Sequence, residues 1–539
     1  MSAGVRGRAL AAGLGVVASA ALYALYSRGT WPWVALGWIG LVPFLRVLER
    51  SRSFGAALAA GVAMAVAFEL AVFGWFAWAI ADYAEATPLV PLLVLALAAP
   101  FLQGQFVALA FARSWLRRRR PQSVAAVAAF SAAVYVATEA VVPKLFADTL
   151  GYPLYGSLWW RQAADLSGVP GLTFVMVAVN ELVWAALRAR AAGAGAASGA
   201  VAAPMLAAIG VVTALSGYGA WRVGTLDGRA RDAGVVFGLV QANLGHYDRM
   251  AAQIGRYETV RTILDTYTEL SAPLSARPDL AVLVWPETVY PTTFGKPKSE
   301  AGAAFDREIV DFAAGTGTPL VFGAYDSDGG AEFNAAFFLA PAAAAPGEPP
   351  GAAVVGVYRK ATLFPLTEYV PAFLDRAWLR ERLPWLGTWS AGAGAQVVSV
   401  PVRGRPPLQV APLICYDVLA PALARAAAAS ADVILTLSND SWFAFGAGPE
   451  LHLQAAAFRS IETRRPQVRA TNTGISAVID AAGRIVARTA VGERATLADR
   501  VHPERLPATL VVRCGEWIVP AAWLLILIVG VRARCGRRP

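Results

Sequence analysis

The chain has 539 residues, of which 57% are hydrophobic and 16% are charged, with a formal net charge of +10 and a mean hydropathy of +0.49. Soluble globular domains contain about 45–50% apolar and about 25% charged residues, so the composition excludes both an ordinary cytosolic protein and a disordered one. Three cysteines and three widely spaced histidines exclude a disulfide framework and a zinc cluster. We therefore expect neither a metal nor another cofactor.

Several apolar stretches approach the length of about 20 residues that a membrane-spanning helix needs. The predicted spans lie near 9–26, 31–48, 54–80, 88–112, 123–142, 168–187, 201–221 and 516–531. The first also has the features of a signal peptide, with Arg6 and Arg8 in front of it. Because further spans follow, we expect it to be a retained helix.

The distribution of positive charge predicts the orientation of these spans. Arginines cluster in alternate connections, whereas the other short connections carry only Arg28, Lys144 and Arg161. The clusters are Arg6 and Arg8; Arg46, Arg50 and Arg52; Arg113 and Arg117 to Arg120; Arg188 and Arg190; and Arg532, Arg534, Arg537 and Arg538. By the positive-inside rule, both termini are cytoplasmic and the long segment near 226–512 is outside. A basic face with aromatic platforms is missing, which argues against nucleic-acid binding.

We expect a transmembrane domain of seven helices at 1–225, an external catalytic domain at 226–512, and a last span with a basic cytoplasmic tail at 513–539. The external segment alternates β-rich runs with helical patterns, which is typical of an α/β domain. The predicted strands are 235–240, 282–285, 320–324, 354–358, 408–414, 433–437 and 475–479, and the clearest predicted helices are 249–270 and 450–464. The Ala- and Pro-rich stretch 341–351 is predicted to be a loop.

Three polar residues each follow one of these strands. They are Glu287 after Trp285-Pro286, Lys360 after Tyr358-Arg359, and Cys415 before Tyr416-Asp417. The carboxyl ends of strands meet at one edge of an α/β sheet, so the three side chains are expected to converge. A base, a cation and a thiol together make a complete acyl-transfer set. Taken singly, a strand-end carboxylate, a surface lysine and a core cysteine are the alternative interpretations.

With the motifs around these residues, the chain resembles the nitrilase (carbon–nitrogen hydrolase) superfamily. Its apolar half makes it similar to a membrane-embedded branch, the apolipoprotein N-acyltransferase family. The matching motifs are Trp285-Pro286-Glu287, Arg359-Lys360, Phe364-Pro365, Glu368-Tyr369-Val370-Pro371, Cys415-Tyr416-Asp417, Ser438 to Phe443, Arg469 to Ser476, and Gln241-Ala242-Asn243. The resemblance implies a multi-pass helical membrane domain with an α-β-β-α sandwich on its outer face.

The resemblance also implies the chemistry. Cys415 is the nucleophile, Glu287 the general base, and Lys360 stabilises the oxyanion together with the backbone N–H of Tyr416. A phospholipid donates the acyl chain through a Cys415 thioester, and a diacylated apolipoprotein accepts it. The expected location is a bacterial inner membrane, with a periplasmic catalytic domain and a monomeric enzyme. Glu368 and Asp417 are expected to support the site.

Departures from the family pattern occur in both halves, and two of them lie in the catalytic half. Asp417 stands where the acyltransferase family usually has Glu, and His246-Tyr247-Asp248 replaces its usual Lys-Trp pair. Tyr247 is therefore a candidate for the aromatic lipid contact, and Trp442 and Phe443 are candidates for a lid or, alternatively, for core packing.

Two other functions remain possible from the sequence. The first is a membrane-tethered amidase or nitrilase that hydrolyses a small C–N substrate. Eight spans argue against it, because one span suffices for a tether. The second is a catalytically inactive transporter or scaffold, which the complete Glu287–Lys360–Cys415 set argues against.

Overall fold

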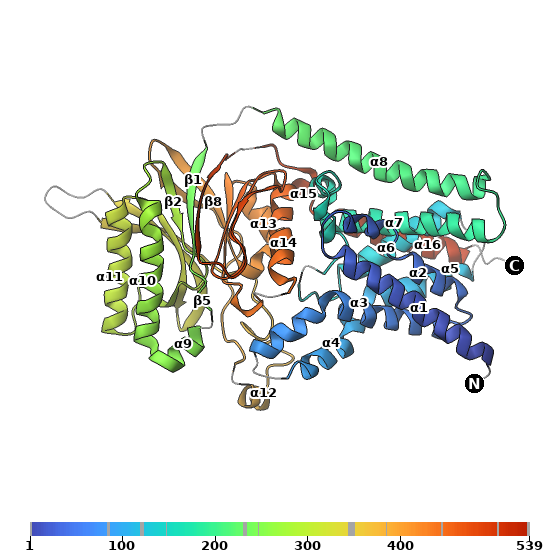
Figure 1. The fold of residues 1–539 in the computed structure, drawn as a ribbon, viewed down its shortest axis with the longest axis horizontal. Coiled ribbons are helices and arrows are strands. Elements are labelled where there is room, and N and C mark those ends of the chain that lie inside the picture. Colours follow the sequence, from blue (N-terminus) through green and yellow to red (C-terminus); the bar gives the residue numbers. More distant parts are fainter. Residues whose placement is uncertain are drawn as a thin grey trace. The chain divides into compact units, whose positions relative to one another are not determined.

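The computed structural model describes residues 3–83, 87–118, 123–146, 148–229, 234–245, 247–342, 351–383, 385–443, 446–503 and 506–535. The chain divides into two compact units (Figure 1). The first comprises Met1–Gly228 and Arg513–Pro539, and the second comprises Arg229–Val512. His246, Arg119, Arg120, Arg537, Arg538 and most of the predicted 341–351 loop lie outside the described residues.

The first unit is helical. Its α-helices are α1 (Ala3–Tyr26), α2 (Val42–Arg50), α3 (Phe54–Tyr83), α4 (Leu89–Leu102), α5 (Gly104–Arg117), α6 (Val124–Glu139), α7 (Ala164–Ala191), α8 (Gly199–Asp227) and α16 (Ile518–Cys535). Short 3-10 helices are η1 (Trp33–Trp38), η2 (Tyr152–Gly156) and η3 (Trp160–Ala163), and α15 (Leu510–Cys514) contains the boundary between the units.

Four of the described helices are long and apolar enough to cross a membrane, or five if the bent pair α4 and α5 forms one span. The prediction of one continuous helix at 31–48 is wrong. That segment forms η1 and α2, because Gly40 and Pro43 interrupt the helical hydrogen bonding. The predicted helix at 88–112 is broken at Gln103, where α4 and α5 meet at 43°.

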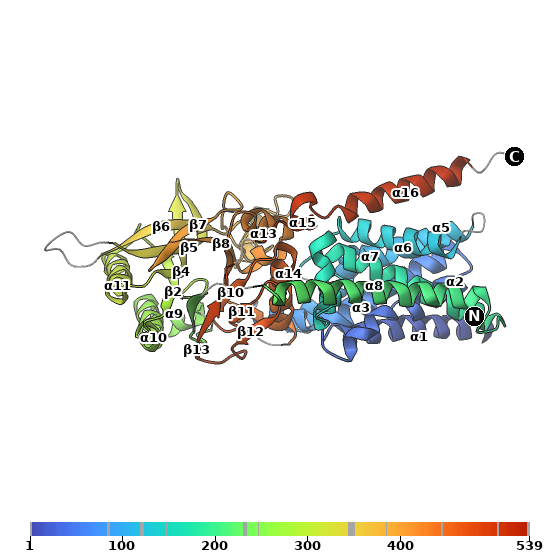
Figure 2. The ribbon, with the colours of Figure 1, turned by 90° about the horizontal axis from the view of Figure 1, so that it is seen from above.

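The C-terminal helix α16 packs with the N-terminal helices. Ala133 and Ala137 of α6 form a cluster with Ala522 of α16, and small residues of this kind allow close contact between helices. Figure 2 shows α16 running beside α6. Residues 513–535 therefore complete a unit that otherwise ends at residue 228.

The second unit contains two sheets. The seven-stranded sheet has the order β13-β1-β2-β4-β5-β6, with β3 also paired to β4. Its strands are β1 (Val235–Gln241), β2 (Leu280–Val284), β3 (Tyr290–Thr293), β4 (Leu320–Asp328), β5 (Ala331–Ala342), β6 (Gly351–Arg359) and β13 (Ala495–Val501). The six-stranded sheet runs β12-β11-β10-β9-β8-β7. Its strands are β7 (Val398–Val402), β8 (Arg405–Ile414), β9 (Val433–Ser438), β10 (Gln467–Thr471), β11 (Ala477–Ile479) and β12 (Ile485–Arg488).

Helices cover the outer faces of both sheets. They are α10 (Arg256–Ser275), α11 (Glu300–Thr316), α13 (Pro421–Ala428) and α14 (Gly448–Thr463). The remaining elements of this unit are the short helices α9 (Tyr247–Ile254) and α12 (Ala377–Arg382) and the 3-10 turns η4 (Cys415–Leu419) and η5 (Ser441–Phe443). Figure 1 shows α10 and α11 on one side of the sheet pair and α13 and α14 on the other. This four-layer α/β unit, together with the apolar helices, confirms the predicted fold class. The predicted helix 249–270 is two helices, because Gly255 adopts a positive φ of 87° between them.

The inner faces of the sheets form one hydrophobic core. Phe237 of β1, Phe338 of β5, Val410 of β8 and Leu435 of β9 belong to the same buried cluster. The strands β1, β2 and β4 are parallel in the first sheet, and β8, β9 and β10 are parallel in the second. Since parallel strands place their carboxyl ends at one edge, residues that follow β2, β8 and β9 are brought together there.

Candidate active site

Cys415 directly follows β8 and is the first residue of η4. Its φ is +47°, in the left-handed region that residues other than glycine seldom adopt. β8 pairs in parallel with β9, and Ile414 lies opposite Leu437. Cys415 therefore lies beside the turn that follows β9, and its side chain is 8% exposed. This sharp strand-to-turn geometry directs the thiol out of the sheet edge.

Glu287 follows β2 and is buried. Its Oε1 accepts hydrogen bonds from Asn334 Nδ2 at 2.7 Å and from Lys360 Nζ at 3.2 Å. Its Oε2 accepts a bond from the backbone N–H of Asn439 at 2.8 Å. A buried carboxylate needs such partners to offset its lost hydration. Both oxygens are therefore held in fixed positions.

Lys360 follows β6 and is almost fully buried between two carboxylates. Besides Glu287, its Nζ donates to Glu368 Oε1 at 2.7 Å, and Glu368 Oε2 accepts from Phe364 N at 2.7 Å. Burial alone would lower the pKa of Lys360, but the charges of Glu287 and Glu368 raise that pKa well above its usual value. The ammonium group therefore stays protonated.

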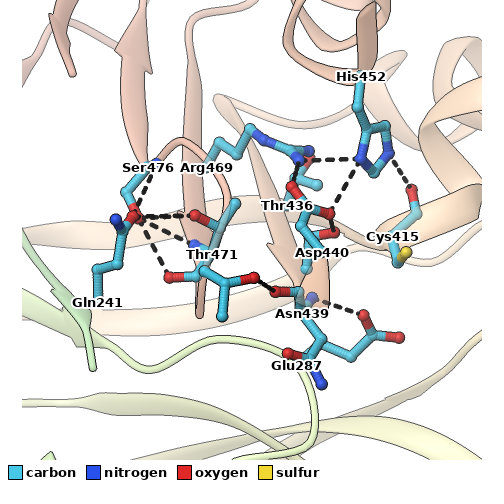
Figure 3. A network of polar contacts seen from close by, with 12 residues as sticks. Gln241, Glu287, Cys415, Thr436, Asn439, Asp440, His452, Arg469, Thr471 and Ser476 are labelled. Carbon is cyan, nitrogen blue, oxygen red and sulfur yellow. Dashed lines mark hydrogen bonds and ion pairs between the residues drawn. The ribbon is translucent and has the colours of Figure 1, made fainter. Parts of the chain in front are cut away.

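The thiol of Cys415 is neutral in this environment. Burial, and then the charge of Glu287, raise the pKa of Cys415 well above the usual value of a thiol, while Lys360 opposes that shift. In Figure 3, the Cys415 sulfur points toward the Glu287 carboxylate. A neutral thiol needs a general base before it can attack a carbonyl group, and of the charges acting on this thiol, that of Glu287 raises its pKa the most.

Asp417 joins the chain segment that follows Lys360 to the residue that precedes Cys415. Its carboxylate accepts hydrogen bonds from Tyr358 Oη at 2.8 Å and from the backbone N–H groups of Ala361, Thr362 and Ile414 at 3.2, 2.6 and 2.9 Å. Burial raises the pKa of Asp417 to about 6, although these donors oppose the shift. The expected supporting role of Asp417 thus has a geometric basis, since it ties the residues after Lys360 to the residue before Cys415.

An aromatic cluster lies next to Cys415. The ring of Phe364 packs on the rings of Tyr416 and Trp442, each at 4.9 Å between centroids, and Trp442 packs on Phe443 at 4.4 Å. Tyr416 and Trp442 are half-buried, whereas Phe443 is 1% exposed. The burial of Phe443 favours core packing over a lid role for this residue.

Tyr247 is half-buried beside the core under α10 and α11. Burial, and then the neighbouring Tyr325 and Glu287, raise its pKa. Tyr247 therefore lies within electrostatic reach of the candidate base.

Two residues of this site, Asn334 and His452, lie outside every motif that the sequence offers. Asn334 lies in the apolar strand β5 and donates to Glu287. His452, Asp440 and Arg469 form a buried polar network behind Cys415 (Figure 3). Asn334 and His452 each stand out in the sequence only as a single polar residue within an apolar run. Such a pattern indicates a buried polar side chain, but it does not say which site that side chain belongs to.

Comparisons with known proteins match both halves of the chain. The family model "Carbon-nitrogen hydrolase" matches residues 239–508, and the model "Apolipoprotein N-acyltransferase N-terminal domain" matches residues 14–182. Among solved structures, an amidase from Nesterenkonia sp. is similar, with a TM-score of 0.36 and 20% identity over 55% of this chain and 98% of that chain.

Curated relatives match across both units. The apolipoprotein N-acyltransferase of Bdellovibrio bacteriovorus is 28% identical over 511 residues, which cover 90% of this chain and 87% of the relative. That of Bradyrhizobium diazoefficiens is 31% identical over 412 residues, which cover 72% of this chain and 70% of the relative. These relatives favour an acyltransferase over the tethered amidase. The chain belongs to the apolipoprotein N-acyltransferase family, a membrane-embedded branch of the carbon–nitrogen hydrolase superfamily.

Proposed function

We propose that the protein transfers a fatty acyl chain from a phospholipid to the α-amine of the N-terminal S-diacylglyceryl-cysteine of apolipoproteins, through a thioester on Cys415. One observation carries the proposal. A buried Lys360 is held between Glu287 and Glu368, at the sheet edge where Cys415 adopts a left-handed backbone. No cofactor is needed for this chemistry, because base, cation and nucleophile are all side chains.

In the first half-reaction, Glu287 takes the proton of the Cys415 thiol as the sulfur attacks the ester carbonyl of the phospholipid. The carbonyl oxygen becomes an oxyanion, which Lys360 and the N–H of Tyr416 stabilise. The oxyanion collapses, the C–O bond breaks, and Glu287 gives its proton to the departing lysophospholipid. A thioester remains on Cys415.

In the second half-reaction, the amine of the lipoprotein attacks the thioester carbonyl. Glu287 takes the proton from the attacking nitrogen, and the same two donors stabilise the second oxyanion. The C–S bond then breaks, Glu287 returns the proton to the sulfur, and an amide is released. Glu368 supports both steps by holding Lys360 at 2.7 Å.

The half-buried rings of Tyr416 and Trp442 are suited to contact the acyl chain beside the thiol, because they present apolar surface next to Cys415. Tyr247 contributes an aromatic contact near Glu287. All the catalytic groups come from one chain, so we propose that a monomer is active.

We further propose that the second unit is periplasmic and that both termini are cytoplasmic in the inner membrane, on the basis of the arginine distribution. Cysteine labelling tests this topology in a variant without native cysteines. An impermeant maleimide added to spheroplasts should label Asp328→Cys, an exposed position of the second unit, but not Ala192→Cys in the connection after α7. The reverse labelling pattern would overturn the proposed orientation.

The decisive experiment is intact mass spectrometry of the purified protein after incubation with phosphatidylethanolamine. We expect one fatty-acyl increment on the wild type and on Cys514→Ala, which changes an exposed cysteine, but none on Cys415→Ala. Addition of a diacylated lipopeptide should then remove the increment and yield an N-acylated peptide. Absence of any increment, together with hydrolysis of small amides, would contradict the proposal.

A further inference from the structure

The backbone carbonyl oxygen of Cys415 is held by a histidine. His452, on α14, places its Nε2 3.2 Å from this oxygen and is 1% exposed. Figure 3 shows the imidazole ring between the Cys415 carbonyl on one side and Asp440 and Arg469 on the other. The mechanism proposed for this protein makes no use of His452.

The contacts around the ring assign its protonation state. A carbonyl oxygen only accepts hydrogen bonds, so Nε2 carries the hydrogen. Nδ1 lies 3.0 Å from Arg469 Nη2, which only donates, and 3.1 Å from Asp440 Oδ1. Burial, and then the charge of Arg469, lower the pKa of His452, although Asp440 opposes the shift. The ring is therefore neutral, with Nδ1 accepting from Arg469 and Nε2 donating to Cys415.

The ring is fixed from several sides. Arg469 Nη2 also donates to Asp440 Oδ2 at 2.7 Å, and Ser438 Oγ donates to Asp440 Oδ1. Although burial opposes it, the guanidinium of Arg469 holds the pKa of Asp440 well below its usual value. Phe443 packs its ring against the imidazole at 5.6 Å between centroids. The donor Nε2 thus has one defined direction.

The Cys415 carbonyl and the Tyr416 N–H belong to the same peptide group. That group is planar and trans, so its C=O and N–H point in opposite directions. A hydrogen bond that fixes the oxygen therefore also fixes the direction of the N–H. An oxyanion donor is effective only when it is aimed in advance at the position where charge develops.

The same turn also contacts the base. Asn439 N donates to Glu287 Oε2, and the next residue, Asp440, contacts the His452 ring that holds Cys415. The residues after β9 thus reach the base directly and the nucleophile's peptide through His452.

We propose that His452 is a positioning residue that aims the Tyr416 N–H at the oxyanion by anchoring the Cys415 carbonyl. This inference rests on the proposed function, because it assumes that Cys415 is acylated. Its role differs from that of Lys360, since His452 acts through the peptide group and touches neither substrate nor reacting atoms.

The test compares His452→Leu, which removes the donor, with His452→Gln, whose amide N–H restores a donor at similar reach, in the full-length protein. Thermal unfolding checks that each variant folds. We expect His452→Leu to acylate Cys415 about 10- to 100-fold more slowly, with KM for the donor nearly unchanged, since loss of one oxyanion donor lowers kcat by about 10²–10³. His452→Gln should recover most of the rate. If His452→Leu does not fold, His452→Asn serves in its place, because its polar side chain is too short to reach the carbonyl.

A second readout separates positioning from general destabilisation. Acylation rates are measured with a p-nitrophenyl fatty acyl ester and with the matched thionoester, whose sulfur is the weaker hydrogen-bond acceptor. The wild type should prefer the oxygen ester strongly, and His452→Leu should reduce that preference along with the rate. A slower variant with an unchanged preference, or a variant with the wild-type rate, would overturn the role of His452. Failure of the wild type itself to acquire an acyl group on Cys415 would instead overturn the proposed function.

Discussion

Both units bury charged side chains to a similar depth, but they use them differently. In the first unit, Arg113 of α5 is 5% exposed and contacts Glu181 of α7 and, at 3.1 Å, Glu49 of α2. In the second unit, Lys360 is 2% exposed and contacts Glu287 and Glu368. The first cluster joins three helices, whereas the second joins loops at one sheet edge beside a nucleophile.

A second polar cluster in the first unit follows the same pattern as the first. Gln103, at the break between α4 and α5, donates to Glu69 at 2.7 Å and to Asp148 at 2.8 Å. It thereby ties α3 to the segment after α6. Burial of charge therefore does not by itself identify a reactive site. What distinguishes the second unit is a thiol with a left-handed backbone next to the buried pair.

The largest expected effect tests the catalytic side of this comparison. Glu287→Gln should slow acylation of Cys415 by about 10²–10⁴-fold, the usual contribution of a general base. The unfolding temperature should also fall, because the single amide oxygen cannot accept from all three donors around this position, so acylation is compared per folded molecule. The control is Asp306→Asn in α11, a buried carboxylate away from the site, which should acylate at the wild-type rate. Acylation of Glu287→Gln within threefold of wild type would remove Glu287 as the base.

Breaking the buried ion pairs of the first unit should lower stability without slowing acylation. Arg113→Leu leaves Glu181 buried without its partner and should lower the free energy of unfolding by about 3–5 kcal/mol. We expect a loss of folded protein, measured by thermal unfolding in detergent, with normal acylation per folded molecule. Arg188→Leu is the matched control, because this exposed arginine also pairs with Glu49, at 3.3 Å, and such surface pairs contribute about 0–1 kcal/mol. Equal stability of the two variants would show that the buried cluster is not structural.

Asp417→Asn should affect both folding and activity. An amide has only one oxygen to accept from the four donors around Asp417, and each buried donor left without a partner costs about 1–3 kcal/mol. We expect a lower unfolding temperature and slower acylation, because the segment after Lys360 loses its anchor. Tyr358→Phe removes a single donor and should be milder. A variant Asp417→Asn with wild-type stability would contradict this account.

The smallest effect concerns pH. A raised pKa of Cys415 means that the thiol stays neutral until the pH exceeds the usual thiol pKa of about 8.5. In a Cys514→Ser, Cys535→Ser background, alkylation by iodoacetamide should therefore be slow at neutral pH and rise only in alkaline solution. Lys360→Gln should move the rise to still higher pH, since Lys360 favours the thiolate. An alkylation rate that already reaches its plateau below pH 7 would instead indicate a preformed pair of the Cys415 thiolate and Lys360.

Much of the fold could be predicted from local pattern. The predicted strand 408–414 matches the end of β8, and the predicted strand 433–437 matches β9, because both are apolar runs bounded by turn residues. The local pattern does not predict the buried strand β10 (Gln467–Thr471), because the strand is only five residues long and carries Arg469 at its centre, where a buried strand is expected to be apolar. Pairing of Arg469 with Asp440 allows that strand to lie inside the sheet.

The candidate site also contains residues that the local sequence pattern predicts and residues that it does not. Glu287, Lys360 and Cys415 could be singled out because each follows a strand, and the structure brings Glu287 and Lys360 to 3.2 Å. Asn334 and His452 could not, because nothing near them in the chain marks their partners. The contact between His452 and Cys415 joins residues 37 positions apart, and that between Asn334 and Glu287 joins residues 47 apart.

The sequence by itself determined the two kinds of unit, because apolar length and strand periodicity are local properties of the chain. It also determined which residues follow the strands of the sheet edge. Only the tertiary structure decided how the thiol, the base and the cation are held. The hydrogen bonds that Asn334, Asn439 and His452 donate, and those that Asp417 accepts, form only after strands and helices distant in sequence have packed. The geometry of such bonds depends on that packing rather than on any local pattern.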